Sequence, residues 1–240
     1  MGDIIDLRAH KRKKLLKAFN KSKRTPKKYN KKISKHSSKV YALIVAVAAL
    51  LLILVSVLKR YTLFSATYSL IGINTIVFIL IYFKKLYFYE LGLSYDRTIR
   101  AGEYYRIVTA AFTHQEVWHI LMNMYSLYNL GRALEPFLGT YRFIIFYTII
   151  MILEGYISAQ IHRKHKPDVY CIGASGVLCG LMGMYLVLAF LMMGFDGIRG
   201  SIPSIICLVL MTASSRIDSI GHFVGLGVGL ICGGVVWQII

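Results

Sequence analysis

The sequence is poor in acidic residues and in cysteine. Only 11 of its 240 residues are Asp or Glu, against 29 Lys and Arg, which gives a formal net charge of +18. Its four cysteines form no CxxC pair and lie in no secreted-domain context; they are Cys171, Cys179, Cys207 and Cys232. A disulfide framework is therefore not expected, and we predict free thiols that pack as small hydrophobic groups.

A recognisable targeting peptide is also missing. The first long apolar run begins only near Tyr41 and is followed by no clear small-residue cleavage site, which argues against a secretory signal. Asp3 and Asp6 argue against a mitochondrial transit peptide, because such peptides are normally poor in acidic residues.

The positive charge is concentrated in the N-terminal 1–40 segment. Residues 1–39 hold fifteen Lys or Arg and two Asp. Such a run is typical of a solvated, disordered tail, and beside a membrane helix it is expected to contact anionic lipid and to mark the cytoplasmic side. No nucleic-acid partner is expected, because the tail lacks a folded reader motif.

The rest of the chain is built from apolar runs. A membrane-spanning helix needs about 20 mostly apolar residues. Seven runs approach this length, namely 41–58, 66–83, 118–135, 141–161, 173–193, 199–214 and 220–240. Backbone polar groups must be hydrogen-bonded within lipid, so these runs predict an all-α, polytopic membrane helical bundle. We expect a six-helix core at 66–240, preceded by one extra transmembrane helix at 41–58.

The segment 84–117 interrupts these runs. It is too polar to span a membrane and too apolar to be a plain linker. We therefore predict an ordered loop that is partly buried at the membrane interface.

Two runs carry glycines at helical one-turn spacing. In 173–193 these glycines begin at Gly173 and Gly176, and in 220–240 Gly225 and Gly229 form a GxxxG pair. Small residues on one face allow helix backbones to approach closely, so these two helices are predicted to touch.

Each glycine-rich run opens with a residue that could carry chemistry. Ser175 lies in Gly-Ala-Ser-Gly, and His222 follows Gly221. A serine nucleophile needs a base within reach. Ionisable groups inside membranes are costly and usually functional, which favours a base over the alternative of a packed, structural histidine.

A further polar pair begins the run 118–135. His119 and Asn123 are four residues apart, so their side chains share one helix face. They could donate hydrogen bonds to an oxyanion, or alternatively join helices within the bundle. The three runs that hold His119, Ser175 and His222 are each separated by one intervening run, so their N-terminal ends are expected at the same membrane face.

Over about 66–240 the chain resembles the rhomboid intramembrane serine proteases. The motifs that carry the resemblance are His119-x-x-x-Asn123, Gly173-Ala174-Ser175-Gly176 and Gly221-His222-x-x-Gly225-x-x-x-Gly229. Two further segments are similar to family motifs, Gly131-Arg-Ala-Leu-Glu135 with Gly139, and Gly102-Glu-Tyr-Tyr105-Arg106, in which Tyr105 replaces the family's Trp.

The resemblance implies a serine endopeptidase that cleaves transmembrane protein substrates. It implies that Ser175 is the nucleophile, that His222 is the general base and acid, and that His119, Asn123 and the Ser175 N–H form the oxyanion hole. The family uses a dyad, and no carboxylate is expected as a third member here. Cys179 stands where family members often carry an aromatic ring, so a looser His222 is expected.

No metal or organic cofactor is expected. His162 and His165 could be mistaken for metal ligands, but the cations around them predict a solvated loop. Two other functions compete with proteolysis: an inactive rhomboid-like protein that binds membrane clients, and a small transporter or channel.

The orientation has two readings. The connections 84–117, 162–172 and 215–219 carry nine Lys or Arg, against four in the opposite connections. This count favours seven spans with an inverted core, a layout that resembles mitochondrial rhomboids. Alternatively, 41–58 does not cross or the tail is translocated. The chain is expected to be a multi-pass protein of a bacterial plasma membrane, with an organelle membrane as the alternative.

Overall fold

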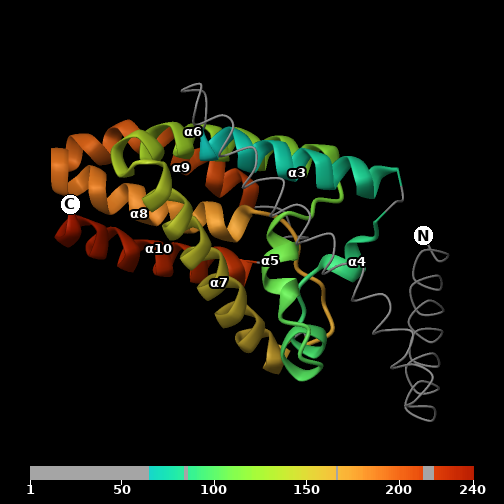
Figure 1. Ribbon diagram of the computed structural model, residues 1–240. Coiled ribbons are helices and arrows are strands. Elements are labelled where there is room, and N and C mark those ends of the chain that lie inside the picture. The colour runs from blue at the N-terminus through green and yellow to red at the C-terminus, as the bar shows by residue number, and fades with distance from the viewer. Residues whose placement is uncertain (1–64, 84–85, 166, 213–218) are drawn as a thin grey trace, which may run out of the picture. The chain divides into compact units, whose positions relative to one another are not determined.

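The computed structural model describes residues 65–83, 86–165, 167–212 and 219–240, all within the compact unit Tyr61–Ile240. The predicted basic tail 1–40 and extra helix 41–58 lie outside the described residues. The described part is an all-α bundle, as the apolar runs predicted (Figure 1).

Six long helices correspond to six of the predicted runs. They are α3 (Ala66–Tyr82), α6 (Val117–Leu138), α7 (Thr140–His165), α8 (Ser175–Met193), α9 (Phe195–Thr212) and α10 (Ser219–Ile239). Three of the described helices are long and apolar enough to cross a membrane, over Thr140–Lys164, Ser175–Met193 and Ser219–Ile239. The apolar helix α3 is shorter, with 17 residues.

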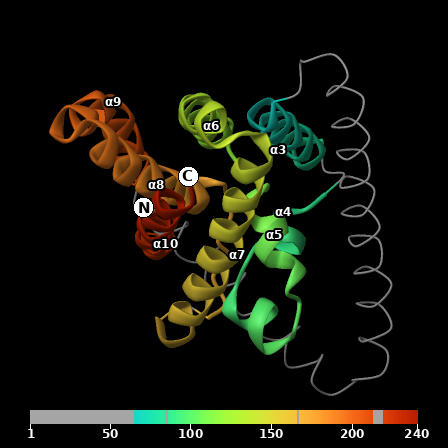
Figure 2. The ribbon, with the colours of Figure 1, turned by 60° about the vertical axis from the view of Figure 1, so that its left-hand side comes forward.

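Helix α8 forms the centre of the bundle. It contacts α6, α7, α9 and α10, and Figures 1 and 2 show it between α9 and α10. Its side chains are buried on several faces; Leu178, Leu181 and Met184 are fully enclosed. A helix that is apolar all round is expected to be buried in this way.

The contact between α8 and α10 is made by glycine backbones. A methyl group at Gly229 would overlap the carbonyl oxygen of Gly180, and one at Gly225 would overlap the carbonyl oxygen of Gly176. The two backbones can approach this closely only because these positions carry no side chain. The predicted contact between the two glycine-rich helices is therefore present.

Glu135, near the end of α6, holds the start of α3. Its carboxylate accepts hydrogen bonds from the backbone N–H groups of Ala66 (2.6 Å) and Thr67 (3.0 Å), and from the hydroxyls of Ser65, Thr67 and Thr140. The N-cap residue Ser65 makes no side-chain cap of its own. Glu135 therefore satisfies N–H groups that a helix start leaves without intrahelical partners.

Gly131 lies one turn before Glu135 at the same contact. A methyl group at Gly131 would overlap the side chain of Thr67. Gly131 thus allows α3 to lie against α6, and the two motif residues Gly131 and Glu135 both lie at the contact between these helices.

The described part of the segment between α3 and α6, residues 86–116, holds three short helices. It contains α4 (Phe88–Leu91), a π-helix (Tyr95–Arg100) and α5 (Tyr105–Ala111). Figure 2 shows α5 alongside α7, and the π-helix also contacts α7.

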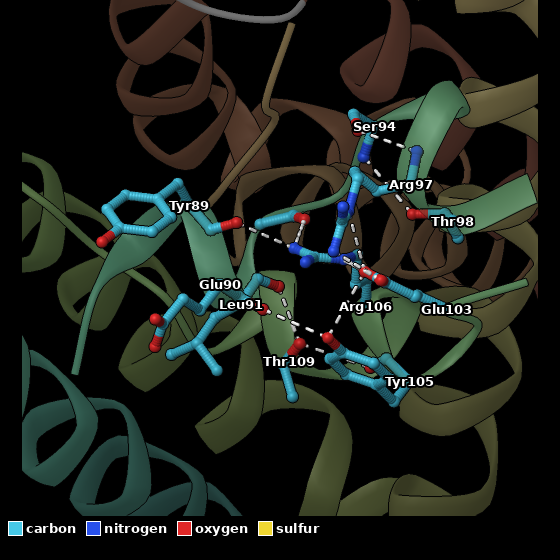
Figure 3. Close-up of polar contacts among 11 residues, drawn as sticks. Tyr89, Glu90, Leu91, Ser94, Arg97, Thr98, Glu103, Tyr105, Arg106 and Thr109 are labelled. Carbon is cyan, nitrogen blue, oxygen red and sulfur yellow. Dashed lines mark hydrogen bonds and ion pairs between the residues drawn. The ribbon is translucent and has the colours of Figure 1, made fainter. Parts of the chain in front are cut away.

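Arg106 holds this segment together (Figure 3). The residue is 2% exposed, and its side chain donates to Glu103 Oε2 (2.6 Å) and to the carbonyl oxygens of Tyr89 (3.0 Å) and Gly92 (2.8 Å). The guanidinium also lies 5.4 Å from the centre of the Tyr105 ring. The Tyr105–Arg106 motif therefore organises the loop that the sequence predicted to be ordered.

Candidate active site

Ser175 and His222 lie within hydrogen-bond distance of each other. Ser175 is the first residue of α8, and His222 lies in the first turn of α10. His222 Nε2 is 2.7 Å from Ser175 Oγ, and the histidine is only 6% exposed. This distance is within the reach that a general base needs to take a proton from a hydroxyl.

The glycines of the α8–α10 contact set this distance. Gly176 follows Ser175, and its carbonyl oxygen lies against Gly225, one turn after His222. The first turns of both helices are therefore held together next to the two side chains.

His119 lies beside the loop that leads into Ser175. A methyl group at Gly173 would come within 2.7 Å of the His119 ring, and Gly173 has a φ of +114°. A residue with a side chain is disfavoured at this φ, so glycine is needed here for both the backbone and the space. His119 thus packs on the backbone two residues before Ser175.

Asn123 lies one turn after His119 and is fully buried. Its Nδ2 donates to the His119 carbonyl oxygen (2.8 Å), and its Oδ1 has no hydrogen-bond partner among the described residues. One of the two Nδ2 N–H groups is therefore engaged within α6, and the second N–H is a further donor on the same amide.

The N-terminus of α8 provides a further group of donors. The first N–H groups of a helix lack intrahelical acceptors, and the helix dipole favours negative charge at that end. Because Ser175 begins α8, an anion formed beside its hydroxyl would lie at this helix start.

His114 is a neighbour that the sequence reading missed. It lies between α5 and α6, is fully buried, and its Nε2 accepts a 3.4 Å hydrogen bond from the Ala174 N–H. Its ring packs edge-on against that of His119, with centroids 4.9 Å apart. Burial, with a smaller contribution from His119, lowers the pKa of His114 to about 3, so the ring is a neutral acceptor.

The loop before Ser175 is also tied to the Arg106 segment through its backbone. Leu93 and Cys171 exchange two backbone hydrogen bonds (3.0 and 2.8 Å), and the Gly173 N–H donates to the Ala110 carbonyl oxygen (2.9 Å). The segment that Tyr105 and Arg106 organise is therefore connected to the loop before Ser175. No direct contact of either residue with Ser175 is seen in the described part of the chain.

The prediction that His162 and His165 lie in a solvated loop was wrong. Both belong to α7 and not to a loop. His162 is 5% exposed, and its Nε2 lies 3.7 Å from Cys171 Sγ. Cys179, one turn after Ser175, is buried, as a small hydrophobic residue would be.

An acidic side chain also reaches this region, which the sequence reading did not expect. A methyl group at Gly176 would come within 2.6 Å of the Glu154 carboxyl carbon. Glu154 belongs to α7, so three helices meet beside Ser175.

Comparison with known proteins identifies the family. Residues 101–239 match the Rhomboid domain. The putative rhomboid protease YdcA of Bacillus subtilis is 30% identical over 148 residues, which cover 59% of this chain and 69% of that protein. Rhomboid-like protease 2 of Toxoplasma gondii is 30% identical over 155 residues, which cover 61% of this chain and 52% of that protein.

A mitochondrial relative is similar over a shorter stretch. Rhomboid protein 1 of Saccharomyces cerevisiae mitochondria is 30% identical over 120 residues, which cover 49% of this chain and 35% of that protein. The chain thus spans about half or less of the length of the Toxoplasma and yeast relatives. The Rhomboid match itself covers more than half of the chain and includes His119, Asn123, Ser175 and His222. The chain therefore belongs to the rhomboid family, whose members are in general intramembrane serine proteases.

Proposed function

We propose that this protein is an intramembrane serine endopeptidase in which Ser175 is the nucleophile and His222 is the general base and acid. The observation that carries the proposal is the 2.7 Å contact between His222 Nε2 and Ser175 Oγ at the starts of two closely packed helices. The naming of the Bacillus and Toxoplasma relatives as proteases supports the same reaction. The substrates are transmembrane proteins, whose peptide bonds reach Ser175 where a substrate helix unwinds.

In the first step, Ser175 Oγ attacks the peptide carbonyl carbon while its proton passes to His222 Nε2. The negative charge that develops on the carbonyl oxygen is stabilised by N–H groups at the start of α8. His119 and Asn123 are the proposed side-chain donors. Asn123 can keep its hydrogen bond to the His119 carbonyl oxygen in this role, because its side-chain amide has a second N–H.

In the following steps, the protonated His222 gives its proton to the leaving amine, and the peptide C–N bond breaks to leave an acyl ester on Ser175. A water molecule then attacks the ester while His222 takes its proton. The ester bond breaks, Ser175 regains a proton from His222, and the new carboxyl terminus leaves. Proton transfer by a positioned histidine typically contributes 10²–10⁴-fold to such a rate.

The limits and setting of the protease domain are proposed from the sequence. The protease domain occupies 66–240, slightly more than the matched 101–239. The basic tail 1–40 binds anionic lipid, and the extra helix 41–58 adds a span before the domain. Both bacterial and mitochondrial relatives are known, and we propose a bacterial plasma membrane for this protein.

The proposal is tested by labelling the purified full chain in detergent with a fluorophosphonate probe. The parent is compared with Ser175→Ala, His222→Ala and, as a control serine in α3, Ser69→Ala. We expect labelling of the parent and the control only, and cleavage of a reconstituted transmembrane substrate by the same two proteins. Equal labelling of all four would rule out the dyad. A parent that binds membrane clients without labelling or cleavage would support the inactive rhomboid-like alternative.

A further inference from the structure

A cysteine and a histidine lie against each other beside the approach to Ser175. Cys171 belongs to the loop between α7 and α8, and His162 lies in the last turn of α7. His162 Nε2 is 3.7 Å from Cys171 Sγ, which is within contact distance for a hydrogen bond that involves sulfur. The two side chains are a thiol and a neighbouring base, the pair of groups that reactive cysteines commonly use.

The thiol is also the more accessible member of this pair. His162 is buried, whereas Cys171 is half-buried and takes part in no disulfide with another described cysteine. The other cysteines that the structure describes, Cys179 and Cys232, are both buried. A reagent dissolved in water therefore has better access to Cys171 than to either of them.

The contact with His162 favours the reactive form of the thiol. The thiolate is the nucleophile in cysteine chemistry, and an ordinary thiol is only a few per cent thiolate near pH 7. A histidine that takes the thiol proton holds the thiolate as one half of an ion pair, and reactive cysteines are found in such surroundings. Cys171 is therefore the described cysteine that is best placed to react with an electrophile or an oxidant.

The backbone at Cys171 is fixed to the fold just before Ser175. Cys171 exchanges two backbone hydrogen bonds with Leu93. The N–H groups of Gly173 and Ala174 donate to groups outside the loop, at 2.9 and 3.4 Å. Because these hydrogen bonds lie within the four residues that precede the serine, a shift of Cys171 is passed along a short, constrained stretch of chain to Ser175.

We propose that Cys171 is a peroxide-sensitive thiol, activated by His162, whose oxidation to a sulfenic acid displaces the loop before Ser175 and slows the protease. The effect on proteolysis rests on the proposed function, whereas the reactivity of Cys171 does not. The site is thus a modification site for hydrogen peroxide that lies outside the Ser175–His222 pair.

The reaction is a two-electron oxidation of the sulfur. The thiol proton passes to His162 Nε2, and the thiolate sulfur attacks one oxygen of hydrogen peroxide. The S–O bond forms as the O–O bond breaks, the peroxide is reduced, and the leaving hydroxide takes the proton from His162 to become water. The product is a sulfenic acid. A dithiol returns it to the thiol, with the disulfide of the reagent and water as the other products.

The added oxygen changes the contact that holds the loop. It is bonded to the sulfur that lies 3.7 Å from His162 Nε2, so the cysteine side chain has to turn or move to make room for it. His162 is fixed by its burial in α7, and the displacement therefore falls on the loop. A displacement near 1 Å at reacting groups can cost about a hundredfold in rate.

The first measurement tests the activation of the thiol without any assay of Ser175. Iodoacetamide alkylates the purified full chain at pH 7, and peptide mass spectrometry gives the rate at Cys171, Cys179 and Cys232. The same chain unfolded in denaturant gives the rate of each thiol without its folded surroundings. The variant His162→Gln removes the imidazole, and Ser158→Ala removes another buried polar group of α7, one turn earlier, as the matched control.

We expect Cys171 to react about three- to tenfold faster in the folded parent than in the unfolded parent, because the imidazole is present only in the folded chain. The two buried cysteines should react more slowly when folded. His162→Gln should lose the acceleration at Cys171, and Ser158→Ala should keep it. A Cys171 that reacts no faster in the folded parent would overturn the inference, and this comparison needs no variant. Acceleration that survives in a folded His162→Gln would overturn it as well.

The second measurement follows the consequence of oxidation. The parent and Cys171→Ser are treated with hydrogen peroxide, and dimedone traps any sulfenic acid for mass spectrometry. Fluorophosphonate labelling of Ser175 is measured before oxidation, after it, and after reduction with dithiothreitol. We expect labelling of the parent to fall by about tenfold or more and to recover on reduction. Cys171→Ser should keep its labelling rate throughout.

Two results would overturn the inference and leave the proposed dyad intact. One is equal inhibition of the parent and Cys171→Ser by peroxide, which would place the damage elsewhere. The other is full labelling of a parent whose Cys171 is oxidised. A reduced parent that is not labelled at Ser175 would overturn the proposed function, and with it the proposed effect of Cys171 on proteolysis.

Discussion

A single methyl group at Gly183 should separate α8 from α10 and disable the proposed dyad. Gly183 faces α10 two turns after Ser175, and the Cβ of an alanine there would lie 2.5 Å from the Leu226 carbonyl oxygen and 2.9 Å from the Leu230 nitrogen. Both are backbone atoms, so no side-chain rotation can relieve the overlap. Gly183→Ala therefore requires the helices themselves to move.

The size of the movement follows from these distances. Ordinary contact begins at 3.4 Å, so the 2.5 Å approach to Leu226 must open by about 0.9 Å. If α10 moves back as a rigid body, the 2.7 Å contact between Ser175 and His222 lengthens to about 3.6 Å. That is beyond the roughly 2.6–3.2 Å over which a base can take a proton directly. A displacement near 1 Å can cost about a hundredfold in rate, and overpacking typically costs 1–3 kcal/mol of stability.

The assay measures the labelling rate of Ser175 with a fluorophosphonate and the thermal unfolding of the same samples. Gly227→Ala is the matched control, because it adds the same methyl group to α10 at a position where no atom of another described helix lies within 4 Å. The control should keep the parent labelling rate and should be as stable as the parent, since alanine favours a helix by up to about 1 kcal/mol over glycine.

Identical labelling and melting of Gly183→Ala and Gly227→Ala would refute the argument. It would mean that the α8–α10 contact tolerates a side chain and that the geometry of the dyad is set elsewhere. A stability loss with full labelling would show that the helices separate without opening the Ser175–His222 contact.

Two further predictions concern the surroundings of the site. Glu135→Gln should lower the free energy of unfolding by about 1.5–3 kcal/mol, because the new NH₂ group would face N–H and O–H donors whose hydrogen bonds the carboxylate accepts. Denaturant titration measures the loss, and unchanged stability would contradict the prediction. Acid should destabilise the protein through His114, whose folded pKa of about 3 lies below its ordinary value near 6.5. Between these two pKa values, His114 binds a proton in the unfolded chain but not in the folded chain. The stability that is present above pH 6.5 is therefore lost as the pH falls toward 3, and the loss is about 2 kcal/mol between pH 6.5 and 4.5. His114→Gln should lose less over that range, and equal losses would count against this cause.

The helices and the glycine contact could be predicted because they depend on local patterns. Apolar runs of about 20 residues specify spanning helices, and glycines one turn apart specify a face that can approach another backbone. Helix α9 was predicted to start too late. It begins at Phe195, so Asp196 and Arg199 lie in its first turns, where they pair with each other at the surface (3.3 Å).

The neighbours of the site that could not be predicted from the sequence, His114 and Glu154, depend on tertiary contacts. His114 lies between two helices, so no periodic pattern indicates where its ring points. Glu154 is an acidic residue in an apolar helix, and its side chain fits beside Gly176 and Gly225 because these two positions on other helices carry no side chain. Neither contact is encoded at a fixed spacing from the residues that it touches, and only the packing of the chain brings them together.

The backbone pairing of Leu93 with Cys171 makes the site sensitive to chain length more than to side-chain identity. Because only N–H and C=O groups take part, substitutions at either position can keep both hydrogen bonds. An insertion or deletion between Cys171 and Ser175 cannot, since it shifts the register of the serine against a fixed anchor. Related sequences should therefore tolerate apolar replacements at 93 and 171 more readily than a change in the four-residue interval to the serine.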